Sequence, residues 1–333
     1  MKTPFTVLWL QAGSCGGCTM SALAAEDVGL VKTLARFGIR LLWHPALSEE
    51  SGAEALAILS AVAEGRTALD CLCVEGAVMT GPNGSGRFQM LSGSGRPTKD
   101  WVTELAARAR YVLAVGSCAA FGGMPAGADM GAIGLQWAGW ERGGALGETF
   151  RSQAGLPVIN AAGCAPHPGW VVETLAALAL GDFTHDNLDA LARPRAFADH
   201  LAHHGCGRNE FYEFKASAAR HSDRGCLMEN LGCKATQAPG DCNLRRWNGG
   251  GSCTDGGFAC INCTSPGFEE PGAPFLETPK LAGIPVGLPV DMPKAWFVAL
   301  AALSKSATPQ RVRANAHADH VVVPPARKAP KTP

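Results

Sequence analysis

The stretch TVLWLQAGSCGGC, residues 6–18, joins an apolar run to a pair of cysteines and decides the expected architecture of the first half of the chain. The run at residues 6–11 predicts a strand, and similar runs rich in Val, Leu and Ile predict strands at residues 40–43, 70–77, 111–115 and 157–161. Helical patterns lie between them at residues 20–37, 54–63, 99–109 and 168–180. Buried strands that alternate with helices predict an α/β domain, a parallel sheet with helices on both faces.

The character of the sequence changes after about residue 182. Residues 185–270 are rich in Gly, Cys, Asn and His and show weak periodicity, so this stretch has little apolar surface to bury, and bound metal is one source of the missing stability. From residue 305 onward the chain carries six Lys or Arg, one Asp and five Pro, which indicates an extended basic tail. The expected domains are therefore residues 1–182 and 183–304, followed by a tail at residues 305–333.

The composition narrows the class of protein. The 333 residues are 47% hydrophobic, enough for a sizeable core, and Lys+Arg and Asp+Glu both number 29. This balance gives no indication of a nucleic-acid partner or an acidic membrane surface. The longest apolar runs, residues 175–180 and 296–303, are much shorter than the ~18 residues of a membrane span, and no signal-peptide pattern is present, so we expect a cytoplasmic protein with no membrane anchor.

The thirteen cysteines carry the most information, because disulfides are rare in a reducing compartment. Their odd number also argues against complete pairing, which leaves metal binding as the leading interpretation. Two of them, Cys71 and Cys73, alternate within a predicted strand. We expect these two to be core residues, because a free Cys packs as a small buried hydrophobe.

Four cysteines of the first half directly follow predicted strands: Cys15, Cys18, Cys118 and Cys164. The carboxyl ends of parallel strands meet at one edge of the sheet, where ligands bind in folds of this class. The glycines that flank these cysteines let the backbone turn closely around a bulky inorganic group. Four converging thiolates predict a [4Fe–4S] cluster, whereas a Cys-x-x-Cys pair alone equally suits a redox dithiol or half of a zinc site.

The second half holds seven further cysteines, one short of two four-ligand sites. His203 stands three residues before Cys206, a spacing from which both side chains can reach one metal, and imidazole replaces thiolate in some clusters. His200 and His204 are its rivals for this role. Zinc ribbons are the main alternative, although only one pair of these cysteines forms the short knuckle typical of zinc. The first expected set is His203, Cys206, Cys226 and Cys233, and the second is Cys242, Cys253, Cys260 and Cys263.

Seven motifs follow one another along nearly the whole chain. They are CGGC (15–18), VEGAV (74–78), GSCAAFGG (116–123), GCAPHP (163–168), HHGCGRNEFYEF (203–214), GCLMENLGCK (225–234) and ACINCTSPGFEEP (259–271). In this order, with cysteines in register, they resemble the small subunit of nickel–iron hydrogenases. The pattern is most similar to the cytosolic branch of that family, which holds regulatory hydrogen sensors and cyanobacterial-type uptake enzymes.

The resemblance implies a flavodoxin-like domain followed by a loop-rich cluster domain. It also implies an electron-transfer role without a catalytic residue in this chain, because the nickel–iron site of the family lies in a separate large subunit that splits dihydrogen. A sensor then binds a signalling kinase and an uptake enzyme reduces a redox partner; of the two, we expect the sensor. The implied ligands are Cys15, Cys18, Cys118 and Cys164 for a proximal cluster, His203, Cys206, Cys226 and Cys233 for a distal cluster, and Cys242, Cys260 and Cys263 for a medial cluster.

Several positions depart from the family pattern. Gly17 and Gly123 stand where oxygen-tolerant members of the family carry extra cysteines, so the resemblance implies an ordinary [4Fe–4S] proximal cluster. Gly16 and Met20 stand where many members have a Thr and a Glu of the proton route. Glu75 is left with two interpretations, as an aid to proton movement or as a structural carboxylate at the end of a strand.

The presence of Cys253 determines whether we expect three or four irons in the medial cluster. Many members of the family supply three cysteines there and have Pro in the fourth place, which favours a [3Fe–4S] cluster. A fourth thiolate can hold a fourth iron, so we expect [4Fe–4S] at this position. The alternative is that Cys253 is a buried thiol beside a three-iron cluster.

Overall fold

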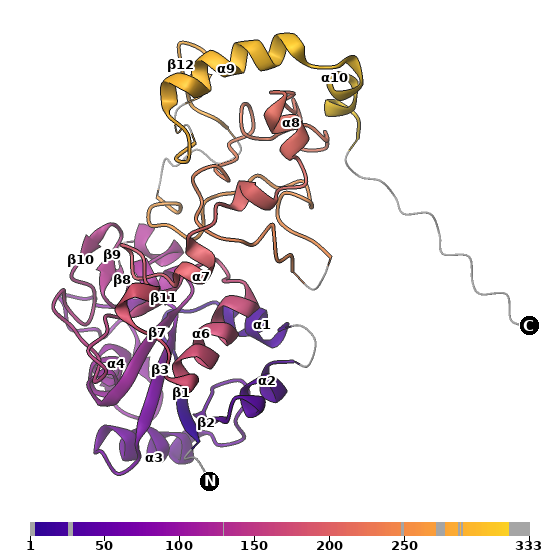
Figure 1. The fold of residues 1–333 in the computed structure, drawn as a ribbon. Coiled ribbons are helices and arrows are strands. Elements are labelled where there is room, and N and C mark those ends of the chain that lie inside the picture. Colours follow the sequence, from indigo (N-terminus) through magenta and orange to yellow (C-terminus); the bar gives the residue numbers. More distant parts are fainter. Residues whose placement is uncertain are drawn as a thin grey trace, which may run out of the picture.

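A computed structural model describes residues 4–25, 29–128, 130–247, 250–270, 277–285, 287 and 289–319 of the protein. The first half is built on a five-stranded sheet whose neighbouring strands are all parallel, in the order β11-β7-β3-β1-β2 (Figure 1). In chain order this is 2-1-3-4-5, the flavodoxin-like order, and it confirms the expected α/β class. The strands are β1 (Phe5–Gln11), β2 (Ile39–Trp43), β3 (Leu69–Glu75), β7 (Ala109–Val115) and β11 (Ile159–Ala161).

Helices cover both faces of the sheet because successive side chains of each strand point to opposite faces. Val7 and Trp9 pack with α1 (Gly17–Leu23), α2 (Leu30–Arg36) and α6 (Pro168–Leu180). Leu8 and Leu10 pack on the other face with α3 (Gly52–Ala63) and α4 (Thr98–Arg108). The strands therefore read as continuous apolar runs, which is why the sequence predicts them to within a few residues.

Two features of this domain refine the sequence analysis. The single helix predicted at residues 20–37 is wrong: α1 ends at Leu23 and α2 begins at Leu30, after Gly29 with a φ of +76°, a backbone conformation that ends or starts helices. Residues 26–28 lie outside the described part. Cys71 and Cys73 are fully buried on β3 with their sulfurs 4.0 Å apart, so the prediction that they are core residues is confirmed.

Short elements complete the first half and lead into the second. Each of four antiparallel pairs is two residues long per strand: β4 (Val78–Met79) with β8 (Ala132–Ile133), β5 (Met90–Leu91) with β6 (Arg96–Pro97), β9 (Trp137–Ala138) with β10 (Glu141–Arg142), and β12 (Lys280–Leu281) with β13 (Ile284–Pro285). The remaining short helices are α5 (Ser117–Phe121), η1 (Met124–Gly127), η2 (His185–Asn187), α7 (Arg195–Ala198), η3 (Ala202–Gly205) and α8 (Asn209–Glu213).

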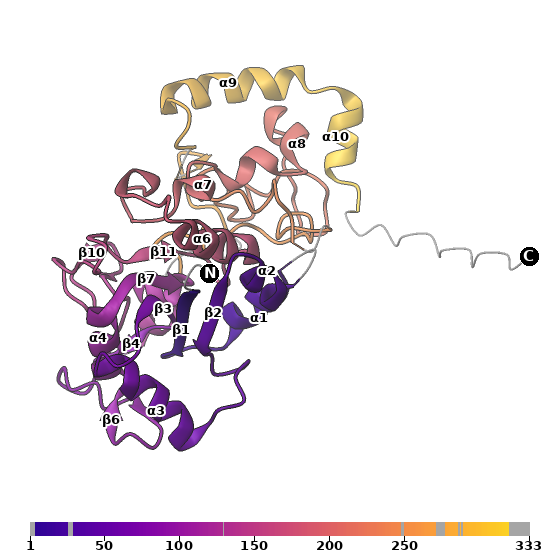
Figure 2. The ribbon, with the colours of Figure 1, turned by 60° about the horizontal axis from the view of Figure 1, so that its bottom comes forward.

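The second domain is rich in loops, as the sequence predicts. Between residues 214 and 270, the described part of the chain contains isolated bridges and turns but no helix or regular strand. The long helix α9 (Lys294–Ala307) lies across the end of this domain that is remote from the sheet (Figures 1 and 2). No helix in the described residues is long and apolar enough to cross a membrane.

The expectation of an extended tail from residue 305 is wrong for its described part. Residues 305–307 end α9, and α10 (Gln310–Ala316) follows. Val312 and Ala316 are buried against Phe211 and Ala216 of the second domain, so apolar contacts hold this helix despite its basic neighbours. The rest of the predicted tail, residues 320–333, lies outside the described residues.

Candidate metal centres

The first group of thiols lies at the carboxyl edge of the sheet, as expected. Cys15 and Cys18 follow β1, Cys118 lies in α5 just after β7, and Cys164 follows β11. Burial raises the pKa of the Cys18 thiol above its ordinary range, and Glu75 together with the other three thiols adds to the shift. Burial also raises the pKa of Cys118 to about 11, with Cys164 and Cys15 as nearby thiols that contribute. The structure thus brings these four sulfurs together, and we name them the proximal set.

Two glycines leave room for the sulfurs of this set. A Cβ added at Gly116, where φ is +88°, would overlap the sulfur of Cys18. A Cβ added at Gly123, where φ is +55°, would lie 2.7 Å from the sulfur of Cys118. The backbone therefore approaches the thiols more closely than any residue with a side chain permits. The extra cysteine of oxygen-tolerant members has no space at position 123 in this conformation.

Glu75 holds the loop that carries the first two cysteines. Its carboxylate is fully buried at the end of β3, and its hydrogen-bond partners among the described residues are donors. Burial raises its pKa, but hydrogen bonds outweigh burial and leave the pKa below its ordinary value. An ionised carboxylate that accepts so many bonds supports the structural interpretation of this residue. The donors are Ser14 Oγ (2.8 Å), Trp9 Nε1 (3.1 Å), the backbone N of Cys18 (3.2 Å), Gln11 Nε2 (3.3 Å) and Thr19 Oγ1.

The second group, which we name the distal set, lines one cavity of the loop-rich domain. His203, Cys206, Cys226 and Cys233 all contribute to its wall. Burial raises the pKa of Cys226 to about 12, with Cys233 and Cys206 as nearby thiols that contribute. The three sulfurs and one imidazole of the predicted set are therefore adjacent in space.

His203 is the histidine that the cavity selects. Its Nδ1 is buried and has no hydrogen-bond partner among the described residues, while its Nε2 lies 2.9 Å from Oδ2 of Asp291. His204 is more exposed and its Nδ1 lies within hydrogen-bonding distance of the backbone N of Leu201. Neither His204 nor His200 lines the cavity. The structure thus favours the histidine chosen from spacing over its two rivals.

Arg208 is a residue of this site that the sequence analysis missed. It is buried, its backbone N donates to the sulfur of Cys206 (3.4 Å), and its guanidinium donates to the carbonyl oxygens of Asp223 (2.7 Å) and Thr254 (3.0 Å). Burial lowers its pKa, but the thiols of the distal set counter that shift. Its Nη2 is buried and has no partner among the described residues, although Arg208 lines the same cavity as His203. Its position in CGRN, two residues after Cys206, was the available signal.

The third group, the medial set, contains Cys242, Cys253, Cys260 and Cys263. Burial raises the pKa of Cys242 to about 12, and Cys263 and Cys253 add to the shift. Cys260 is likewise perturbed by burial, and its raised pKa also reflects Cys233, Cys263 and Cys242. Cys253 therefore lies with the other members of the set, where the sequence placed it, although its own side chain is exposed.

The three sets form a series. The thiols of Cys263 and Cys164 interact electrostatically, which links the medial set to the proximal set. The backbone N of Cys260 donates to the sulfur of Cys233 (3.4 Å), which links the medial set to the distal set. The medial set thus lies between the other two. Cys263 is its member nearest the proximal set, and Cys260 is its member nearest the distal set.

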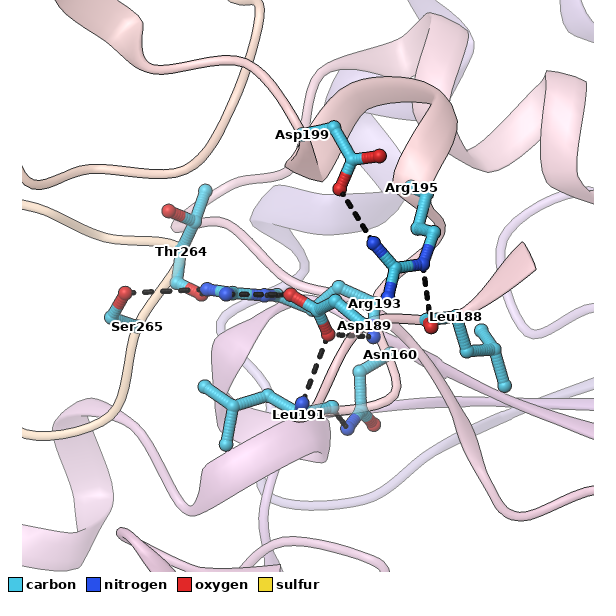
Figure 3. Close-up of polar contacts among 9 residues, drawn as sticks. All are labelled: Asn160, Leu188, Asp189, Leu191, Arg193, Arg195, Asp199, Thr264 and Ser265. Atoms are coloured by element: carbon cyan, nitrogen blue, oxygen red, sulfur yellow. Dashed lines mark hydrogen bonds and ion pairs between the residues drawn. The ribbon is translucent and has the colours of Figure 1, made fainter. Parts of the chain in front are cut away.

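A buried arginine fixes the joint between the domains beside Cys263. Figure 3 shows Arg193, whose guanidinium forms an ion pair with Asp189 (2.7 Å) and donates to the carbonyl oxygen of Thr264 (2.9 Å). The side-chain Nδ2 of Asn160, in β11, donates to the carbonyl oxygen of Leu191 (2.7 Å), which lies between Asp189 and Arg193 on the chain. These contacts hold the loop of the medial set against the strand that precedes Cys164.

The donors of all three sets fit iron–sulfur clusters. The thiols whose pKa burial raises, such as Cys18, Cys226 and Cys242, resist ionisation, and bound metal ions supply the charge that compensates their thiolates. The unpartnered Nδ1 and Nη2 in the distal cavity point to a guest that accepts hydrogen bonds or binds imidazole, because buried polar atoms rarely stay unpaired. Sets of four thiolates, as in the proximal and medial sets, are typical of clusters, and imidazole replaces thiolate in some of them. The assignment of individual ligands remains a prediction.

Comparison with known proteins supports the same class. The family described as NADH ubiquinone oxidoreductase, 20 Kd subunit, matches residues 15–178. The family described as the C-terminal part of the NiFe/NiFeSe hydrogenase small subunit matches residues 199–276. The first match contains the proximal set and the second contains the distal and medial sets, so each half is recognised separately.

Relatives match over most of their length. The chain is 33% identical to the F420 non-reducing hydrogenase I small subunit of Methanosarcina mazei, over 86% of this chain and 78% of the relative. It is 31% identical to the periplasmic [NiFeSe] hydrogenase small subunit of Desulfomicrobium baculatum, over 81% of this chain and 86% of the relative.

Solved structures agree in fold. The structure superposes on the actinobacterial-type NiFe-hydrogenase from Ralstonia eutropha H16 with a TM-score of 0.74 and 26% identity, covering 92% of each chain. It superposes on the [NiFeSe] hydrogenase from Desulfovibrio vulgaris Hildenborough with a TM-score of 0.70 and 29% identity, covering 82% of this chain and 98% of the other.

Proposed function

Because the chain belongs to the small subunits of nickel–iron hydrogenases, we propose that it relays electrons between a catalytic large subunit and an acceptor through three iron–sulfur clusters. Small subunits of this family pair with a large subunit, which holds the nickel–iron active site. Iron–sulfur clusters supply one-electron storage at potentials set by their ligands, hydrogen bonds and burial. The proposed types are [4Fe–4S] for the proximal, medial and distal clusters.

The serial arrangement of the three sets is the observation that carries this proposal. Electron tunnelling falls steeply with distance, so a relay needs neighbouring centres in sequence. The contact of Cys263 with Cys164 and the contact of Cys260 with Cys233 supply that order. The chain itself positions the centres and tunes them: Glu75 orients the proximal loop, and the Arg208 charge stabilises anionic ligands in the distal set.

Metal analysis of the purified complex tests the proposal against the zinc-ribbon alternative. We expect about 12 acid-labile sulfides per heterodimer for three four-iron clusters, about 12 irons to match them, one further iron from the nickel–iron site of the large subunit, and no stoichiometric zinc. Zinc without iron supports an interaction module in place of an electron carrier. Replacement of Cys15 with Ser is expected to remove one cluster and leave the others in place.

The surface over the proximal set is the proposed interface with the large subunit. Cys15 and Cys164 are exposed in the isolated chain. Large apolar side chains are also exposed on the segments that follow the second and third cysteines of the set: Met20 is 72% exposed and Met124 is 57% exposed. Such apolar surface beside a reactive centre marks a protein interface. We expect an obligate heterodimer that buries about 2,000 Å² or more, so that the chain expressed alone loses its proximal cluster or aggregates.

Two physiological roles compete beyond the relay. The names of the relatives describe enzymes, which supports delivery of electrons to a redox partner over the sensor role expected from sequence. Turnover separates them: an uptake enzyme reduces its partner rapidly with hydrogen, whereas a sensor turns over slowly and binds a kinase. The cytoplasmic location is a separate proposal that rests on the sequence alone, and fractionation of cells with an antibody against the chain tests it directly.

A further inference from the structure

His203 presents its two ring nitrogens to different surroundings. Nδ1 is buried without a partner among the described residues, in a ring that lines the distal cavity with Cys206, Cys226 and Cys233. Nε2 lies 2.9 Å from Oδ2 of Asp291, a residue outside the cavity wall. The imidazole thus bridges the thiol set and a carboxylate that no cysteine motif contains.

Asp291 reaches this position from a distant part of the chain, 88 residues beyond His203. It precedes α9, and the segment is anchored by Phe297, which is 4% exposed and packs with Tyr212 and Met228. Tyr212 also contacts the ring of His203, with 5.3 Å between ring centroids. The packing of α9 therefore fixes where the carboxylate lies relative to the imidazole.

We propose that Asp291 is a positioning residue for the distal cluster, which holds the Nε2 hydrogen of His203 and so keeps the lone pair of Nδ1 turned toward the cluster iron. A carboxylate is an acceptor only, so the bond at Nε2 leaves Nδ1 without a proton in the neutral ring. Histidine ligands of metals commonly donate their second nitrogen in this way, and the partner raises the basicity of the ligating atom. The inference rests on ligation of the distal cluster by His203.

The neighbouring histidine supplies a matched control. His204 Nε2 lies 3.2 Å from the same Oδ2, but its side chain is 39% exposed and does not line the cavity. Loss of His204 removes one contact of the carboxylate and leaves the contact with His203. Glu213, an exposed carboxylate at the end of α8 beside Tyr212, supplies a second control for the loss of one negative charge nearby.

The experiment measures the distal cluster itself in the purified heterodimer. Asp291→Ala, Asp291→Asn, His204→Ala and Glu213→Gln are compared with the wild type by pulsed electron paramagnetic resonance for nitrogen coupling, and by redox titration for the distal midpoint potential. In the wild type we expect nitrogen coupling to the reduced distal cluster. The Ala variant at position 291 is expected to alter that coupling and to shift the one-electron redox equilibrium about tenfold, which equals about 59 mV, toward a higher potential.

The outcomes separate the two claims. Asp291→Asn keeps an acceptor oxygen but not the charge, so it is expected to retain the nitrogen coupling and raise the potential, and it serves as the test if the Ala variant does not fold. Both control variants are expected to match the wild type. Wild-type coupling and potential in both Asp291 variants overturn the positioning role while the ligation by His203 stands. Absence of nitrogen coupling in the wild type overturns the ligation and this inference with it, but leaves the other two clusters of the relay untouched.

Discussion

Replacement of Glu75 with Gln separates the two interpretations of this buried carboxylate. The substitution keeps the size of the side chain but turns one acceptor oxygen into an NH₂ group. The carboxylate of Glu75 accepts from five donors, so in either orientation the NH₂ of the amide faces at least one group that also donates. The less costly orientation places the NH₂ where Oε1 lies now, opposite Ser14 and Cys18.

The magnitude follows from those two partners. The hydroxyl of Ser14 can rotate to accept from the new NH₂, but the backbone N–H of Cys18 can only donate and is left unpaired. A buried donor without a partner costs about 1–3 kcal/mol, and the remaining bonds lose their charge assistance. We therefore expect the loop of Cys15 and Cys18 to be destabilised by about 2 kcal/mol, which corresponds to roughly a 30-fold change in an equilibrium or rate.

Cluster retention is the suitable assay because unfolding of a multi-subunit metalloprotein is irreversible. The loss of visible iron–sulfur absorbance is followed in the heterodimer at fixed urea concentration, and the initial phase is assigned to the proximal cluster by electron paramagnetic resonance. Glu75→Gln is expected to lose that cluster up to roughly 30 times faster than the wild type. Glu64→Gln, the same change at an exposed carboxylate, is expected to leave the rate unchanged.

If Glu75 instead aids proton movement, the variant gives the opposite pattern of results. In that case Glu75→Gln retains the proximal cluster at the wild-type rate but slows the exchange of hydrogen isotopes at the partner's active site. That result would refute the structural account of Glu75.

Three further predictions concern other parts of the chain. Gly116→Ala should abolish the proximal cluster by iron analysis, because its Cβ overlaps a cluster thiol, whereas Gly139→Ala, also at positive φ but with no atom within 4 Å, should keep it. Cys253→Pro should create a [3Fe–4S] resonance in the oxidised protein; the same signal in fresh anaerobic wild type contradicts a four-iron medial cluster. Burial raises the pKa of Glu229, but its bonds to a lysine of α9 and to a serine outweigh burial and lower it below 4.5. This carboxylate therefore stabilises the docking of α9 fully above about pH 4.5 and loses that contribution as the pH falls through its lower folded pKa. Hydrogen exchange in α9 should accelerate over that range, and Glu229→Gln should remove the pH dependence.

The elements that the sequence predicts well are those whose signal is local. The strands were located because both of their faces are buried, so Val7 and Leu8 are apolar for different cores but read as one run. The cysteine sets could be grouped because strand ends converge in a parallel sheet and because the family motifs keep their order. Cys71 and Cys73 were separated from the ligands by their alternation within a strand.

The parts that were missed depend on contacts between distant residues. No spacing connects Asp291 with His203, and only the packing of α9 brings them together. The helicity of residues 310–316 follows from burial of Val312 against Phe211, which outweighs a basic, Pro-containing context. The break at Gly29 was missed for a different reason. The helical pattern of the sequence continues across this residue, although its φ of +76° is not helical.

Reduction of the clusters by hydrogen in the purified complex tests the central claim most directly. The oxidised heterodimer is exposed to hydrogen and sampled by rapid freezing, and electron paramagnetic resonance counts the electrons taken up by each centre. A relay predicts that three one-electron centres in this chain become reduced, and that Cys260→Ala, which breaks the middle of the series, leaves the proximal centre reducible but slows the arrival of electrons at the distal centre. Clusters that hydrogen does not reduce, or a distal centre that fills at the wild-type rate in that variant, would contradict the account.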